Sequence, residues 1–278
     1  MAQHSSPTAR PNWIAGGLST IWLIIIGVPI ISMIVWGLTT ERAFRDAGPL
    51  AIPTVWTFDN VTEIIDRGFL GYYWNTAIIT VASIALSLVL ALPAAYAIVR
   101  SRSWLASASF RMFLLGLAIP AQAVIIPLYL IITEMGLYDT LIAVILPTVA
   151  FTLPLVILIL SGALRDVPRD VYEAMTLDGA GSFRMLVNAV IPIARGSISA
   201  VCIFVGLNAW NSFIFPLIFI RSEENTVVTL GLRQFQQEFA VDIPGLMMAV
   251  LISAIPVFLL YLFARRWLIA GLAGAGGR

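Results

Sequence analysis

Six apolar runs of about 20 residues or more divide this 278-residue sequence, and none contains an Asp, Glu, Lys, Arg or His. A helix of about 20 residues crosses a hydrocarbon core of about 30 Å. Charged residues make up only 11% of the chain, whereas a soluble domain carries about 25%. The sequence therefore predicts an all-α integral membrane protein with six transmembrane helices, surrounded by membrane lipid, and excludes a soluble domain, a disordered chain and a nucleic-acid-binding protein. The expected spans are about residues 13–38, 74–99, 112–133, 141–164, 198–220 and 245–264.

The arginines indicate the orientation of these spans. All 16 basic residues are arginines, and eleven of them fall in four segments that share one side of a six-span chain. Positive charge in short loops marks the cytoplasmic side of a membrane protein. Both termini are therefore expected in the cytoplasm. The four segments are the tail 1–12, the loop 100–111, the loop 165–197 and the tail 265–278.

The absence of ionisable residues from the apolar runs separates classes of transport protein. Proton relays, ion-coupled carriers and voltage sensors place such residues at membrane depth. The sequence therefore argues against an autonomous secondary transporter. It also argues against an intramembrane enzyme or a metal site, because His4 and Cys202 are the only His and Cys.

The loop 165–197 is the longest on the cytoplasmic side, and its residues predict a folded unit. The spacing of Asp170 and Glu173 is that of a capping box at the start of a helix. We expect this helix over about 171–178, with Gly179 as a left-handed C-terminal cap, followed by a second helical stretch. A short helix, a glycine turn and another helix form a docking surface for a partner.

This loop resembles the EAA-type loop of permease subunits from bacterial binding-protein-dependent ABC importers. The family pattern is Glu-Ala-Ala, three residues, Gly, nine residues and Ile-x-Leu-Pro. The spacing from Glu173 through Gly179 to Pro192 matches it. The sequence departs from the pattern only by exchanging apolar residues, at Met175, Ala189 and Ile191.

Further strings along the chain are similar to the carbohydrate importers of this family. LPAAYAIVR at 92–100 resembles the end of the second span, and IPLY and GLYDT within 126–140 resemble the third span and its following loop. The Trp-Asn pair at 210–211 resembles a fifth-span motif. The basic, Gly- and Ala-rich end at 264–278 is similar to G-type subunits such as that of the maltose permease.

The resemblance implies a type I ABC importer permease fold in which residues 1–278 form a single transmembrane domain. It implies a heterodimer with a second permease subunit, a dimer of ATPase subunits beneath it and an extracytoplasmic solute-binding protein, all at the bacterial cytoplasmic membrane. Such a subunit moves solute by alternating access and is not an enzyme. ATP and Mg²⁺ belong to the partner ATPase, because the phosphate-binding motif GxxxxGK[ST] needs a lysine and this chain has none.

The resemblance also assigns the contact with the ATPase to the helix and turn of the EAA-type loop. Small side chains allow close approach of a partner helix, the glycine allows a sharp turn, and the glutamate can pair with a cation. The alternative is that the glutamate only caps its own helix. The residues implied are Glu173, Ala174, Asp178, Gly179 and Ala180.

Solute contacts are predicted from amide and aromatic side chains within the spans. Sugars are bound by hydrogen-bonding amides and flat apolar faces. Asn208 and Asn211 are three residues apart on one helix face, with Trp210 between them, and Gln122 is a further amide in the third span. The alternative is hydrogen bonding between helices, which is common for polar residues in membranes. A sugar or sugar derivative is the expected solute, with a polyol or a glycerophosphodiester as the alternative.

Overall fold

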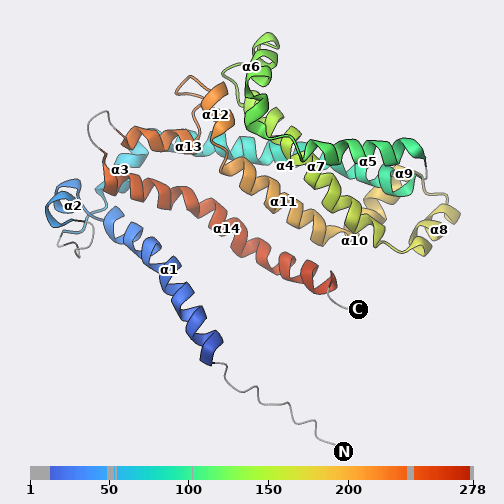
Figure 1. Cartoon of the computed structure of the whole chain (residues 1–278), viewed down its shortest axis with the longest axis horizontal. Coiled ribbons are helices and arrows are strands. Elements are labelled where there is room, and N and C mark those ends of the chain that lie inside the picture. Colours follow the sequence, from blue (N-terminus) through green and yellow to red (C-terminus); the bar gives the residue numbers. More distant parts are fainter. Residues whose placement is uncertain (1–12, 49–52, 54, 102, 237–240, 276–278) are drawn as a thin grey trace, which may run out of the picture. The chain divides into compact units, whose positions relative to one another are not determined.

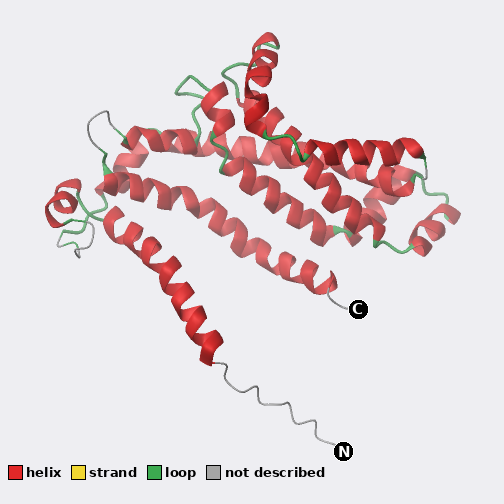
Figure 2. Cartoon of the chain, in the orientation of Figure 1, coloured by secondary structure: helices red, strands yellow, loops and turns green. Residues whose placement is uncertain are grey.

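A computed structural model of the chain describes residues 13–48, 53, 55–101, 103–236 and 241–275, with side chains described up to residue 262. Within these residues the secondary structure is helical, apart from an isolated bridge between Gln236 and Val241 (Figure 2). This confirms the all-α class. The expected tail 1–12 lies outside the described residues, and much of the expected tail 265–278 continues a helix that ends at Ala275.

The chain divides into two compact units, residues 1–66 with 235–252 and residues 67–234 with 253–278. The first unit contains three helices and the start of the last one. Its helices are α1 (Trp13–Gly37), α2 (Glu41–Ala47), α3 (Asp59–Asp66) and the beginning of α14 (Ile243–Ala275).

A buried amide fastens the end of α1 to α3 in the first unit. Asn60 donates from Nδ2 to the backbone oxygens of Gly37 at 2.7 Å and of Thr39 at 2.8 Å. These oxygens belong to the last residue of α1 and to the turn just after it, where no intrahelical donor reaches them. Most of α1 carries exposed apolar side chains, as expected of a helix that meets lipid or a partner subunit.

The core of the second unit lies where three long helices pack against one another (Figure 1). One of them presents Ser83, Ser87, Ala91 and Ala95, all fully buried, at intervals of four residues. Small side chains at this spacing form one helix face and let two backbones approach closely. The three helices are α4 (Phe69–Arg100), α7 (Leu141–Arg165) and α11 (Arg195–Trp210).

The third predicted span, 112–133, is divided between two helices that meet at an angle of 93°. Helix α5 (Trp104–Gly116) runs beside α7, and α6 (Ile125–Glu134) leaves it after the short 3₁₀ helix η1 (Ala121–Val124). Pro120 lies at the break with extended backbone angles. Proline lacks an amide hydrogen and disfavours helical angles in the residue before it, so the helix cannot continue.

The fifth predicted span is divided in a similar way. Helix α11 ends at Trp210, and a second, shorter helix begins only at Ile214. The helical stretch before α11 meets it at an angle of 82°. The segments around it are α8 (Arg169–Leu177), α9 (Ser182–Met185), the π-helix η2 (Leu186–Val190), α10 (Ile191–Ile193), α12 (Ile214–Phe219), α13 (Val228–Gly231) and the 3₁₀ helix η3 (Leu232–Phe235).

Among the described residues, four helices are long and apolar enough to cross a membrane, and six spans result if each bent pair is counted as one. Helices α1 and α7 begin and end within one residue of the predicted runs 13–38 and 141–164. Helix α4 begins five residues earlier than the predicted 74, at Phe69. The count of six and the placing of the termini stay predictions.

Candidate functional site

The loop 165–197 folds into the helix, turn and helix that its residues predict. Helix α8 ends at Leu177, and Gly179 follows with φ of +73°. The amide of Ala180 donates to the oxygen of Met175 at 2.9 Å, and that of Gly179 donates to Thr176 at 3.0 Å. These two bonds form a Schellman motif, which satisfies the last carbonyls of a helix and places its glycine in the left-handed region.

One face of α8 is fixed to the core of the second unit. The ring of Tyr172 is buried, and the guanidinium carbon of Arg100, at the end of α4, lies 4.3 Å from its centroid. A cation over an aromatic face is attracted by the ring electrons. Ala180 and Met185 are buried in the same cluster, and the hydroxyl of Tyr96 contacts the sulfur of Met185 at 3.5 Å. The α8 unit, by which we mean residues 169–185 with α8, its glycine turn and α9, is therefore packed against the end of α4.

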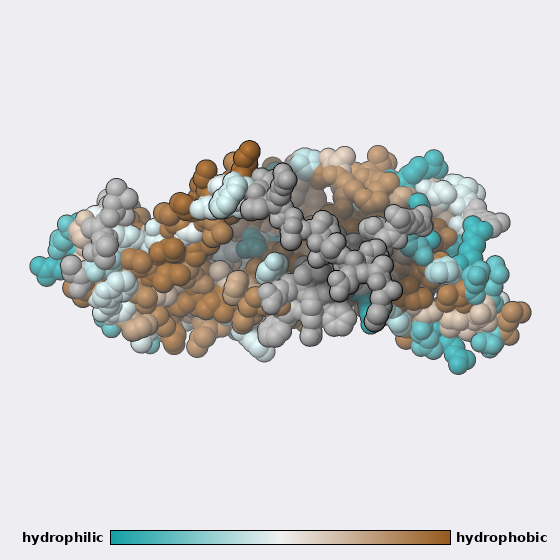
Figure 3. Space-filling view, turned by 90° about the horizontal axis from the view of Figure 1, so that it is seen from below, coloured by the Kyte–Doolittle hydropathy of each residue, from teal (hydrophilic) through white to brown (hydrophobic). Residues whose placement is uncertain are grey.

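The other face of α8 is exposed and mostly polar, with a large apolar side chain at Leu177 and another at Phe183 in the next helix. Leu177 is 89% exposed and Phe183, at the start of α9, is 79% exposed. Glu173 and Ala174 are exposed beside them. On the face drawn in Figure 3, hydrophilic side chains gather at the end that carries α8 and α9. Two large, exposed apolar side chains surrounded by polar residues are typical of a protein interface, which has an apolar centre and a polar rim.

The structure does not form the capping box expected of Asp170 and Glu173. Pro168 is the N-terminal cap of α8, and no side chain bonds to the first amides. Pro168 itself fixes the backbone angle at the start of α8, so the helix begins without a side-chain cap. Within the described residues Glu173 makes no hydrogen bond or ion pair, so its carboxylate is available to a partner.

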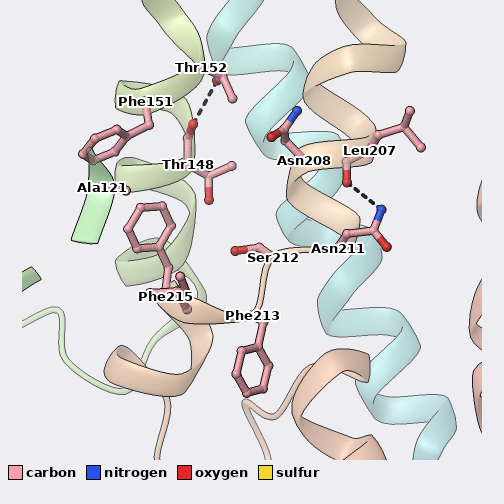
Figure 4. A pocket seen from close by; sticks show the side chains of 11 residues that line it. Ala121, Thr148, Phe151, Thr152, Leu207, Asn208, Asn211, Ser212, Phe213 and Phe215 are labelled. Carbon is pink, nitrogen blue, oxygen red and sulfur yellow. Dashed lines mark hydrogen bonds between the residues drawn. The ribbon is translucent and has the colours of Figure 1, made fainter. Parts of the chain in front are cut away.

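A cavity of about 640 Å³ lies between α7, α11 and the start of α12 (Figure 4). Hydroxyls and amides face it together with aromatic rings. None of the described residues that line it is ionisable. Its lining residues are Ala121, Thr148, Phe151, Thr152, Leu207, Asn208, Asn211, Ser212, Phe213, Ile214 and Phe215.

The two predicted asparagines both line this cavity. Asn208 donates from Nδ2 to the backbone oxygen of Phe204 at 2.8 Å, and Asn211 donates to that of Leu207 at 2.9 Å. Each amide nitrogen thus bonds to its own helix, four residues back. The side-chain oxygens keep their capacity to accept hydrogen bonds, so a hydroxyl-rich solute can donate to them.

Trp210 and Gln122 are placed elsewhere. The indole nitrogen of Trp210 donates to the backbone oxygen of Ser253 in α14 at 3.1 Å, and its ring lies 6.0 Å from that of Tyr73. Trp210 therefore joins helices, as the alternative interpretation expects. Gln122 lies exposed in η1 and is not among the lining residues, although its neighbour Ala121 is.

Sequence reasoning missed the contribution of α7 to the cavity. Thr148 and Thr152 are four residues apart, so they share one helix face. Their hydroxyls donate to the backbone oxygens of Val144 at 2.7 Å and of Thr148 at 2.9 Å. The four-residue spacing of two threonines in an apolar run could have indicated a polar helix face. Threonines in membrane helices commonly bond to their own backbone, however, so the spacing alone does not indicate a binding site.

Comparison with protein families decides the identity. The family described as binding-protein-dependent transport system inner membrane component matches residues 83–273. The chain belongs to this family. The match covers both the α8 unit and the cavity, and it confirms the resemblance drawn from the motif at 173–192. The permease is thus a transport component of the ABC importer class.

Its relatives among known proteins include importers of sugars. The permease is 30% identical to a putative ABC transporter permease of Caldicellulosiruptor sp., over 92% of this chain and 93% of the relative. It is 31% identical to the diacetylchitobiose uptake system permease protein NgcG of Streptomyces coelicolor, over 95% and 87% of the two chains. A third relative is the melibiose/raffinose/stachyose import permease MelC of Bacillus subtilis, at 29% identity over 78% and 79%.

A solved structure shows the same fold. It is a bacterial ABC transporter involved in the import of the acidic polysaccharide alginate, and one of its chains superposes with a TM-score of 0.82. The alignment covers 95% of the permease and 99% of that chain, at 20% identity. The fold is therefore that of an ABC importer permease.

Proposed function

We propose that this permease forms half of the translocation pathway of an ATP-driven importer and couples to an ATPase subunit through α8. The observation that carries the proposal is the two-sided construction of α8. Tyr172 ties one face to α4, and Leu177 and Phe183 offer an apolar surface on the other. A partner that moves this surface therefore moves the ends of the core helices.

The remaining components follow from the same proposal. Both termini and α8 lie in the cytoplasm, and a second permease subunit completes the pathway in the bacterial cytoplasmic membrane. Two ATPase subunits hold ATP and Mg²⁺, and a solute-binding protein delivers solute from outside. The contact with the ATPase uses the exposed residues Glu173, Ala174, Asp178 and Gly179, with Leu177 and Phe183 as its apolar anchors. Ala180, which was expected in this contact, is buried and supports the turn from its inner side.

The proposed solute is a neutral sugar or sugar derivative, held in the cavity between α7 and α11. Hydroxyls of Thr148 and Thr152 and amides of Asn208 and Asn211 lie around it with the ring of Phe151. Hydrogen-bonding groups beside flat aromatic faces suit a carbohydrate. A glycerophosphodiester is disfavoured, because none of the described lining residues offers a cation to its phosphate. A polyol remains the alternative solute.

A charge placed on the open face of α8 tests the coupling. The complex is purified through a tag on this chain, and the co-purifying ATPase is quantified. Leu177→Asp removes an apolar anchor, whose burial contributes about 1.5–3 kcal/mol. The affinity for the ATPase should fall by about tenfold to a hundredfold, while the second permease subunit is retained.

The matched control is Asn188→Asp, which adds a charge at an exposed position in η2, further along the same loop. It should leave the ATPase bound. If Leu177→Asp keeps the ATPase as firmly as the unmodified chain does, α8 is not the coupling element and the proposal fails.

A further inference from the structure

A basic pocket lies where α4 and α7 end and α5 begins. Its volume is about 260 Å³. Two arginines from different helices line it, Arg111 of α5 and Arg165 of α7. The other lining residues are Ile98, Ser107 and Phe110. The pocket is separate from both the cavity between α7 and α11 and the open face of α8.

The two arginines carry no compensating charge. Within the part of the chain that the structure describes, neither Arg111 nor Arg165 lies within ion-pair distance of a carboxylate. The guanidinium carbon of Arg165 is instead 5.6 Å from the centroid of the Phe110 ring. Two like charges that face one small pocket repel each other, and an anion between them removes that repulsion. Guanidinium groups bind phosphate oxygens through paired hydrogen bonds.

A second, mostly apolar groove, which Ser101, Ser103 and Ser109 also line, shares one wall with the pocket. It has a volume of about 350 Å³, and Ile98 lines both spaces. Small side chains on facing turns of α4 and α5, such as Ala97 and Ala106, leave room between the helices. Phe113 and Leu105 supply larger apolar walls. The groove therefore suits a hydrocarbon chain that continues from an anionic group in the pocket.

The position along the helices is that of a membrane surface. Helices α4 and α7 are apolar along their length and carry their charged residues, Arg100 and Arg165, only at this end. Trp104, in the first turn of α5, is 76% exposed. Terminal arginines and exposed tryptophans mark the level of lipid headgroups.

We propose that the pocket and the groove together bind one anionic phospholipid. Its phosphate lies between the guanidinium groups of Arg111 and Arg165, with the hydroxyl of Ser107 as a further donor. One acyl chain follows the groove between α4 and α5. Basic pockets between membrane helices on the cytoplasmic side bind anionic headgroups in this way. The site rests on the proposed function only for its assignment to the cytoplasmic leaflet.

Lipid retention by the assembled complex tests this site. The complex is reconstituted with phosphatidylcholine and phosphatidylglycerol at three to one, extracted in detergent, and its bound lipid is counted by native mass spectrometry. The unmodified complex should keep phosphatidylglycerol in preference to phosphatidylcholine. The double variant Arg111→Gln with Arg165→Gln should lower its affinity for phosphatidylglycerol by about thirtyfold. Arg184→Gln, a neutralisation outside the pocket, should keep it.

A groove variant separates a lipid from a soluble phosphate. Ala97→Phe fills the groove and leaves both arginines in place, so phosphatidylglycerol should be lost. Inorganic phosphate, followed by the melting temperature of the complex, should stabilise the unmodified protein and this variant alike. If Ala97→Phe retains the lipid, the acyl chain does not use the groove and the phospholipid assignment is overturned.

One other result would also overturn the proposal, namely retention of phosphatidylglycerol by the double arginine variant. If that variant also loses a partner subunit, the pocket is assigned to an acidic protein surface. Neither readout depends on transport, so failure of the lipid site is distinguishable from failure of the coupling proposal.

Discussion

Asp139 fastens the turn between α6 and α7 to the loop after α12. Its Oδ1 accepts hydrogen bonds from the amides of Arg221 at 2.9 Å and Ser222 at 3.0 Å, and from the Ser222 hydroxyl at 3.0 Å. Asp139→Ala removes this acceptor and should lower the free energy of unfolding by about 1–2 kcal/mol. The melting temperature of the purified complex measures the loss.

Asp139→Asn is the matched control, because it keeps a side-chain oxygen and tolerates the left-handed φ of 60° at this position. The amides of Arg221 and Ser222 hold the pKa of Asp139 below its usual value. The carboxylate therefore stabilises the fold fully above the unfolded pKa, about 3.9, and this part is lost as pH falls through the folded pKa. If the melting temperature changes with pH in the same way in Asp139→Asn and in the unmodified chain, the Asp139 carboxylate does not stabilise the fold in this way.

The buried aromatic side chain of Tyr172 is the largest contact of helix α8 with the core. The ring of Tyr172 is buried under Arg100, but its hydroxyl makes no hydrogen bond within the described residues. Tyr172→Phe should therefore be nearly neutral, whereas Tyr172→Ala removes a buried ring and costs about 3 kcal/mol or more. Hydrogen exchange in α8 should become about a hundredfold faster in the alanine variant. Similar exchange in both variants would show that α8 is held by other contacts.

The elements differ in how far their sequence determines them. Apolar length predicts α1 and α7 because each is a single helix whose ends coincide with a change in polarity. It does not reveal the 93° bend between α5 and α6, since the residues on both sides of the break are apolar. Pro120 was the available signal, but prolines such as Pro147 and Pro154 lie within the unbroken α7.

The sites show the same limit. Gly179 is predictable because a left-handed cap is a local requirement of the backbone. The cavity is not local, since it needs α7 and α11 to lie side by side. The sequence therefore identifies Asn208 and Asn211 by residue type, while Thr148 and Thr152 become visible only through packing. The same packing takes Trp210 away to α14.

The distribution of charged residues along the whole chain bears on the energy source for solute uptake. The core helices α4 and α7 keep their charged residues at one end, Arg100 and Arg165, and α11 begins with Arg195. None of the six apolar runs contains an Asp, Glu, Lys, Arg or His, the residues that form proton relays through a membrane. Under the proposed function, energy for uptake against a gradient enters from outside the spans, through α8.

This distribution predicts that uptake depends on ATP and not on the proton gradient. The importer is reconstituted in vesicles with ATP inside, and uptake of a neutral oligosaccharide delivered by the binding protein is followed. A protonophore should leave the initial rate within about twofold, because no step needs a membrane proton relay. A non-hydrolysable ATP analogue should abolish accumulation. If the protonophore stops uptake while ATP hydrolysis continues, the chain belongs to a proton-coupled mechanism, and its uncharged spans would require a relay supplied by the partner subunit.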